Sequence, residues 1–312
     1  MALPANFDAV IDEAWQRART VPGYIGELEF RALGLLAAAS PPGGVTVEIG
    51  SFKGKSTVAL ASLAAHGGLG PVVSIDPHSA PSVTDPPLEG QPSSFHDFLG
   101  TLRHTGLQPH VEVHRAPSRD VAAHWRRPIR FLWIDGYHTY AGAKQDFDLF
   151  LPFLVEGAIV AIHDTLHEFE GPIRIFVEEM LRSDKFGPAG FFHTIGWAEH
   201  RPSDGARFRA GRERLARRAA KLIPIVAVRT PRKRACPAAL QAAPRPGAAR
   251  RLVARRVDHP DAASQPLSHS YRSARIGGLR FARCGVRSRP WTNSPLDPGA
   301  GSSRRRRSAP VR

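Results

Sequence analysis

Short runs of aliphatic and β-branched residues alternate with longer segments of mixed polarity over the first 200 or so residues. The apolar runs predict strands at 45–48, 72–75, 111–114, 129–134 and 158–162. The intervening segments predict helices at 56–65, 94–104, 118–124, 140–154 and 171–182, and two more helices, 6–19 and 27–38, precede the first strand. The expected fold class is therefore α/β: a doubly wound, mostly parallel, Rossmann-like sheet with helices on both faces.

A glycine-bearing turn follows the first predicted strand, in the segment Glu48-Ile-Gly-Ser-Phe-Lys-Gly-Lys-Ser56. Gly50 and Gly54 let the backbone turn sharply and approach a ligand closely. Ser51 and Ser56 place hydroxyl groups in the same turn, just before a helix. The Glu48 carboxylate would repel phosphate, but it suits a cationic or hydroxyl-rich ligand. Such a strand, loop and helix start predict a cofactor site.

Several kinds of loop compete for this segment. A P-loop needs four residues between its first glycine and the Gly-Lys-Ser, whereas Gly50 and Gly54 enclose three. The dinucleotide fingerprint G-x-G-x-x-G is not met. The S-adenosylmethionine loop, E/D-x-G-x-x-x-G, matches at Glu48, Gly50 and Gly54. An ordinary turn between strand and helix remains the alternative without a ligand.

Ionisable side chains follow the other predicted strands. Asp76 ends the second strand, where a carboxylate can accept hydrogen bonds from ribose hydroxyls, although capping a turn is the simpler role. Asp135, His163 and Asp164 follow the fourth and fifth strands, and these residue types can ligate a hard divalent cation such as Mg²⁺ or Mn²⁺. His138 could reach the same space as a general base. Loop packing of His138 and helix capping by Asp164 are the alternatives.

These motifs together resemble a known family, the class I S-adenosylmethionine-dependent methyltransferases. The resemblance is to the small-molecule and sugar O-methyltransferase branch of macrocin-type enzymes, of the methyltransferase family 24 type, and covers roughly residues 20–200. It is carried by Val47-Glu-Ile-Gly-Ser-Phe-Lys-Gly-Lys-Ser-Thr57, Ser74-Ile-Asp76, Trp133-Ile-Asp-Gly-Tyr-His-Thr-Tyr140, Asp146, Leu151-Pro-Phe-Leu-Val-Glu-Gly157, Ile162-His-Asp-Thr165 and Gly171-Pro-Ile-Arg174. One departure is the single Gly157 beside Glu156, where the family often has two glycines.

The resemblance implies an O-methyltransferase that uses S-adenosyl-L-methionine, with a metal assisting the transfer to a sugar or other small-molecule hydroxyl. Ser118 would lie near the adenine, and Asp135 would contact the cofactor as well as the metal. The implied roles of the remaining residues fall into three groups: Glu48, Gly50, Ser51, Gly54, Ser56 and Asp76 bind the cofactor, Asp135, His163 and Asp164 bind the metal, and His138 is the catalytic base.

The Pro- and Ser-rich segment 78–94 follows Asp76 and would hang over this site. We interpret it as a lid or acceptor-binding loop, with a surface insertion as the alternative. The segment 207–228 predicts a basic amphipathic helix that runs into a short apolar stretch. We expect a methyltransferase domain over residues 1–228 and a separate tail over 229–312.

Charge divides the chain at the same place. Residues 229–312 contain 20 lysines and arginines against 3 acidic residues, whereas residues 1–228 contain 23 against 25. The tail is rich in Arg, Pro, Ala, Ser and Gly and is expected to be disordered. It fits a basic arm for anionic surfaces or a stretch translated in a shifted reading frame, and we favour the second.

Other features of the composition exclude certain kinds of bonds, ligands and binding partners. Both cysteines, Cys236 and Cys284, lie in the tail, so the body has no disulfide and no cysteine-ligated metal. No signal peptide and no apolar stretch long enough for a membrane are visible, so a cytoplasmic protein is expected. Nucleic-acid binding, including an RNA methyltransferase that uses the tail, is disfavoured for the near-neutral body. Homo-oligomerisation and the identity of the acceptor stay open.

Overall fold

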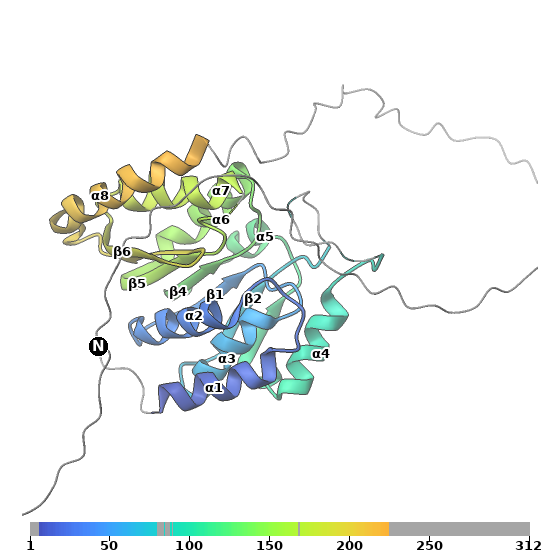
Figure 1. The fold of residues 1–312 in the computed structure, drawn as a ribbon. Coiled ribbons are helices and arrows are strands. Elements are labelled where there is room, and N and C mark those ends of the chain that lie inside the picture. The colour runs from blue at the N-terminus through green and yellow to red at the C-terminus, as the bar shows by residue number, and fades with distance from the viewer. Residues whose placement is uncertain (1–5, 80–83, 85–87, 89, 168, 225–312) are drawn as a thin grey trace, which may run out of the picture. The chain divides into compact units, whose positions relative to one another are not determined.

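The computed structural model describes residues 6–79, 84, 88, 90–167 and 169–224, all within one compact unit that spans residues 1–241. Seven strands form one sheet in the order β3-β2-β1-β4-β5-β7-β6 (Figure 1). The strands β1 to β5 pair in parallel, while β7 pairs antiparallel with both β5 and β6. The strand bounds are β1 Val45–Ile49, β2 Val72–Ile75, β3 Val111–His114, β4 Ile129–Ile134, β5 Leu154–Ile162, β6 Phe186–Phe192 and β7 Ile195–His200.

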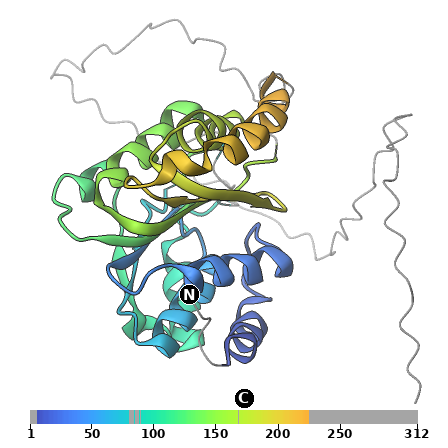
Figure 2. The same cartoon turned by 90° about the vertical axis from the view of Figure 1, so that its left-hand side faces the viewer.

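Helices cover both faces of this sheet (Figures 1 and 2). One face carries α1 Phe7–Ala18, α2 Glu27–Ala39, α3 Lys55–Gly67 and α4 Phe95–Thr105; the other carries α5 Ser118–Ala122, α6 Tyr140–Phe150, α7 Glu170–Arg174 and α8 Arg209–Ala219. A π-helical segment, Ile175–Leu181, continues α7. The expected fold class is confirmed.

Alternate residues of each central strand enter two separate cores. In β4, Phe131 and Trp133 pack with the side chains of α1 to α4, such as Phe30. The neighbouring Leu132 and Ile134 pack on the opposite face, in the core that includes Phe147. All six residues of β4 are buried, Arg130 included, which explains the apolar run from Phe131 to Ile134. The two cores fix the sheet between its helical layers.

Two segments differ from the sequence expectation. The helix expected over 140–154 ends at Phe150, because Pro152 enters a 3₁₀ turn and β5 begins at Leu154. The antiparallel pair β6 and β7 was not expected, since Gly187, Pro188 and Gly190 make this stretch look like a loop. Strand β6 lies at the edge of the sheet, where a proline is tolerated.

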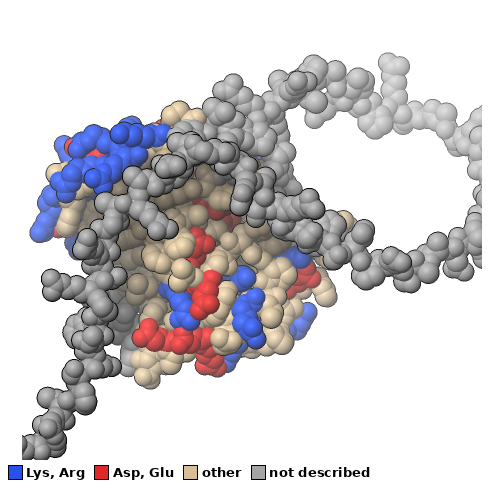
Figure 3. All heavy atoms as spheres, viewed as in Figure 1, with Lys and Arg blue, Asp and Glu red and all other residues tan. Residues whose placement is uncertain are grey.

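The C-terminal part of the described chain is a basic amphipathic helix, as expected. In α8, Arg212, Ala216 and Ala219 are buried while the other arginines face outward. Figure 3 shows lysine and arginine side chains gathered over this helix. The boundary expected at 228 and the tail expected over 229–312 lie outside the described residues. None of the described helices is long and apolar enough to cross a membrane.

The sheet has a topological switch point between β1 and β4, because the chain winds from β1 to β2 and β3 on one side and to β4 and β5 on the other. Parallel sheets bind ligands at the carboxyl ends of the strands at such a point. Gly50 leaves β1 there with φ +87°, and a Cβ on it would lie 2.2 Å from the Asp135 carbonyl oxygen. Only glycine fits this contact between the two strand ends.

We predict that Gly50→Ala destabilises the protein by more than about 3 kcal/mol, because strain at positive φ adds to a backbone collision. Gly68→Ala is the matched control: its φ is also positive, +61°, but no atom lies within 4 Å of the added Cβ. We expect a loss of about 1 kcal/mol there. Urea unfolding of both variants measures the difference, and equal losses would show that the contact with Asp135 is not tight.

Candidate active site

A cavity of about 740 Å³ lies at the carboxyl ends of β1, β2, β4 and β5. All but two of the predicted site residues line it, namely Gly50, Ser51, Ser56, Asp76, Ser118, Asp135, His138, His163 and Asp164. The exceptions are Glu48, which lies in β1, and Gly54, which directly precedes α3; neither lines the cavity. Thr84 and Leu88, the described residues inside the segment 80–89, also line the cavity, which agrees with a lid or acceptor loop.

Glu48 is fully buried beneath the glycine loop. Its carboxylate accepts hydrogen bonds from the hydroxyls of Ser51 at 2.8 Å, Ser56 at 2.6 Å and Thr57 at 2.5 Å. Burial raises the pKa of Glu48 to about 7, although the three hydroxyl donors act in the opposite direction. The carboxylate therefore ties the end of β1 to the start of α3, and the hydroxyls it binds belong to the protein.

Asp76 fixes the same loop from the side of β2. Its Oδ2 accepts hydrogen bonds from the backbone amides of Ser51 and Phe52, both at 2.8 Å, and Oδ1 accepts one from the His78 amide at 2.6 Å. A P-loop uses its backbone amides to hold phosphate. Because a carboxylate occupies two of these amides, the geometry disfavours the P-loop interpretation.

Ser118 stands at the start of α5 and donates a hydrogen bond to Asp146 on α6. Both residues are buried and both line the cavity. The sequence placed Ser118 at a helix start but did not identify Asp146 as a site residue. One signal could have found it: Asp146 is an acidic residue on the buried face of α6, where the other buried residues are Ala143, Phe147 and Phe150.

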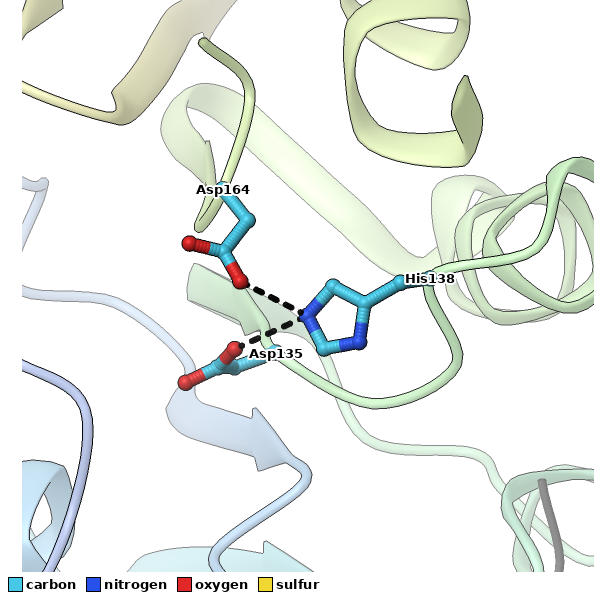
Figure 4. A group of neighbouring side chains, drawn as sticks. All are labelled: Asp135, His138 and Asp164. Carbon is cyan, nitrogen blue, oxygen red and sulfur yellow. Dashed lines mark ion pairs between the residues drawn. The ribbon is translucent and has the colours of Figure 1, made fainter. Parts of the chain in front are cut away.

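Asp135, His138 and Asp164 form a compact group of ionisable side chains on the cavity wall (Figure 4). The His138 imidazole points between the two carboxylates, with Nε2 at 3.5 Å from Asp135 Oδ1 and 3.3 Å from Asp164 Oδ2. The potential ligand atoms of the three residues lie within 4.8 Å of one another. Asp164 does not cap a helix: it occupies a turn with φ +53°, a backbone conformation that is costly for a residue other than glycine.

The charges in this group stabilise one another. Burial alone would lower the pKa of His138, but the close carboxylates of Asp135 and Asp164 raise it to about 9. Burial would likewise raise the pKa of Asp135, but the charge of His163, its hydrogen bond and the charge of His138 lower it to about 2. At neutral pH His138 is therefore an imidazolium, and its positive charge compensates the negative charge of Asp135.

His163 lies next to this group and faces a different partner. Its Nδ1 is 3.1 Å from Asp135 Oδ1, and its Nε2 is 3.7 Å from Glu29 on α2. His163 Nδ1 also lies 3.7 Å from Asp164 Oδ1, so both histidines lie beside the two carboxylates. His138 is the histidine whose potential ligand atom lies within 4.8 Å of those of Asp135 and Asp164 as one group. The metal-ligand role of His163 and the base role of His138 both stay predictions.

Glu29 is a site residue that sequence reasoning missed. It accepts hydrogen bonds from the Thr194 amide at 3.1 Å and the Thr194 hydroxyl at 2.6 Å, in the turn between β6 and β7. Burial would raise the pKa of Glu29, but His163 and Thr194 lower it to about 2. Glu29 therefore joins α2, the end of β5 and the β6–β7 turn at the cavity wall.

Residues 47–165 match the model of a family described as a methyltransferase domain. Among solved structures, the O-methyltransferase NovP is similar over 62% of this chain and 98% of its own, at 12% identity and a TM-score of 0.50. An O-methyltransferase from Bacillus cereus in complex with SAH is 18% identical over 62% of this chain and 91% of its own, with a TM-score of 0.45. The TDP-rhamnose 3'-O-methyltransferase CalS11 is 15% identical over 64% and 96%, with a TM-score of 0.42.

We predict that Asp164→Asn lowers the pKa of His138 from about 9 toward its ordinary value near 6.5, because one of the two supporting charges is lost. Histidine titration by NMR in metal-free protein measures this shift. By linkage, the raised pKa stabilises the native protein fully below about pH 6.5, and this contribution is lost as pH rises through about 9.

The control for this titration is Asp148→Asn, since Asp148 is exposed on α6 and pairs with Lys144. It should leave the His138 titration where it is in the wild type. An unchanged His138 pKa in Asp164→Asn would show that the imidazole does not lie between the two carboxylates in solution.

Proposed function

We propose that this chain, which matches a methyltransferase-domain model over residues 47–165 and folds around a mostly parallel sheet, is an O-methyltransferase that transfers the methyl group of S-adenosyl-L-methionine to a hydroxyl of a small molecule. The observation that carries the proposal is the group of Asp135, His138 and Asp164 on the wall of the cavity that the glycine loop also borders. A hydroxyl is a weak nucleophile at neutral pH, and ionisable groups that control its proton are what this transfer requires.

The cofactor would lie along the carboxyl ends of β1 and β2. Asp76 faces the cavity at the end of β2, where ribose hydroxyls would reach its remaining lone pairs. Gly50 and Ser51 allow close approach of the ligand to the loop, and Ser118 borders the same cavity. This placement directs the methyl group toward Asp135, at the end of the neighbouring strand β4.

The side chains fit a hard divalent cation. Two carboxylates and one imidazole offer ligand atoms within 4.8 Å of one another, the donor set that Mg²⁺ or Mn²⁺ accepts in proteins. A bound divalent cation would lower the pKa of the acceptor hydroxyl and fix its direction. Asp135 and Asp164 would hold the ion, with His163 or His138 as a third ligand.

His138 has two roles that exclude each other. With a pKa near 9 it is protonated at neutral pH and cannot accept a proton from the acceptor. It acts as the base only when another positive charge on Asp135 and Asp164 returns its pKa toward 6.5. Otherwise it is a ligand, or it holds the two carboxylates in place. Its ring also packs on Phe169 at 4.5 Å, which fixes its orientation toward the cavity.

The acceptor would enter beside the residues that complete the cavity wall, including Tyr24, His167 and Phe169. Tyr24 is exposed at this edge, which suits contact with the apolar face of a sugar ring or with a flat aromatic ring. We therefore propose a sugar or similar hydroxylated small molecule as the acceptor. The cytoplasmic location and the homo-oligomer remain predictions.

Transfer of a labelled methyl group from S-adenosylmethionine to a panel of sugars and phenols, with Mg²⁺ or Mn²⁺ present, tests this function. We predict that chelation and Asp164→Ala each reduce transfer by more than about 100-fold, because the acceptor hydroxyl then keeps its proton. Asp148→Ala, which removes an exposed aspartate outside the cavity, should leave transfer unchanged. Undiminished transfer after chelation and in Asp164→Ala would refute the role of the metal.

A further inference from the structure

The positive charge of the described chain is concentrated near its C-terminal end. Residues 1–228 are close to neutral as a whole, but residues 201–224 contain eight lysines and arginines against two acidic residues. Most of these basic residues belong to α8 and the turns on either side of it, and Figure 3 shows their side chains gathered over this helix. The near-neutral body therefore carries one strongly basic surface, which attracts anions.

Four of these basic residues form a stripe along α8 and the 3₁₀ turn that continues it. The stripe consists of Arg214, Arg217, Arg218 and Lys221, all of them exposed. Their spacing of three and four residues places them on one side of the helix. Arg217 lies 3.8 Å from Glu213, whereas the other three form no ion pair with the residues that the structure describes. The stripe thus carries uncompensated positive charge.

The stripe borders a groove of about 400 Å³ between α8 and the edge strand β6. Arg214 and Arg218 line this groove, and its apolar lining consists of Pro188, Ala189, Phe208 and Leu215. No residue of the groove lines the active-site cavity. An aromatic ring and two guanidinium groups therefore meet at a second site, separate from the ends of the parallel strands.

We propose that the stripe and the groove bind single-stranded nucleic acid. Proteins that bind such strands combine basic side chains, which hold the phosphates, with aromatic rings on which the bases stack. Guanidinium groups suit the first task because they pair with two phosphate oxygens at once. The phosphates would lie along Arg214, Arg218 and Lys221, and a base would enter the groove against Phe208. This inference does not rest on the proposed function.

Other occupants fit this surface less well. A basic amphipathic helix binds a membrane through its apolar face, but in α8 that face is used within the protein, where Ala216 and Ala219 are buried. An acidic peptide could add a strand to β6, but Pro188 lacks the backbone N–H that such pairing needs. The segment 229–312 of the chain is itself basic, so the stripe would repel it.

Fluorescence anisotropy of a labelled oligo(dT) of about 15 nucleotides, titrated with the full chain at several salt concentrations, tests the proposal. We predict that Arg214→Gln combined with Arg218→Gln weakens binding about tenfold at low salt. The slope of log Kd against log salt should fall by about 1.4, because two phosphate contacts are lost. Phe208→Leu should weaken binding about fivefold without changing this slope, because stacking on the ring releases no counterions.

The matched control is Arg19→Gln combined with Arg103→Gln. It removes the same charge at exposed positions after α1 and on α4, in the other helical layer, and should leave the slope unchanged. Equal effects of the two double variants would overturn the proposal, because charge anywhere on the chain would then suffice. An unchanged affinity in Phe208→Leu would refute the base site in the groove. Binding of anionic phospholipid vesicles or polyglutamate without binding of oligo(dT) would overturn the choice of nucleic acid.

Discussion

The cavity depends on a loop that two carboxylates hold from opposite sides. Glu48 is buried behind the loop and binds the hydroxyls of Ser51, Ser56 and Thr57, while Asp76 binds the backbone amides at the front. A buried carboxylate is costly unless its lone pairs are satisfied, and here the three hydroxyls satisfy them. The loop therefore keeps one conformation before a ligand arrives, and the cofactor does not have to order it.

The same need for compensation explains the charges at the other strand ends. Asp135, Asp164 and Glu29 bring three carboxylates to one side of the cavity, and His138 and His163 lie among them. The histidines have raised pKa values because of these carboxylates, and the pKa values of Asp135 and Glu29 are low because of the histidines. The carboxylates and histidines therefore compensate one another's charge, and a cation or an acceptor that enters would change this balance.

Much of this arrangement could be predicted from the sequence, because parallel strands bring their carboxyl ends together. The apolar runs located the five parallel strands, and Asp76, Asp135 and Asp164 follow from where those runs end. Glu29 could not be predicted, since its partner Thr194 lies 165 residues away and its helix gives no sign of a site. The sequence also could not predict how His138 and His163 are placed around Asp135, because the spacing of residues along the chain does not determine side-chain orientation.

The β6–β7 pair is a part of the fold that the local sequence could not predict. Its glycines and proline favour a loop locally, but pairing of β7 with β5 buries Ile195 and Ala198 and decides the outcome. Tertiary contacts of this kind also position Thr194 against Glu29. The edge of the sheet and one wall of the cavity are therefore set by long-range packing, whereas the glycine loop is held by Glu48 in the same segment and by Asp76 at the end of the next strand.

The proposed function requires that an adenosyl cofactor bind through this preformed loop, at the carboxyl ends of β1 and β2. Calorimetric titration of the full chain with S-adenosylhomocysteine, and separately with ATP and Mg²⁺, measures this binding. We predict binding of S-adenosylhomocysteine that is lost in Asp76→Ala, and no binding of ATP. Binding of ATP without binding of S-adenosylhomocysteine would contradict it and would restore the phosphate-binding interpretation of the loop.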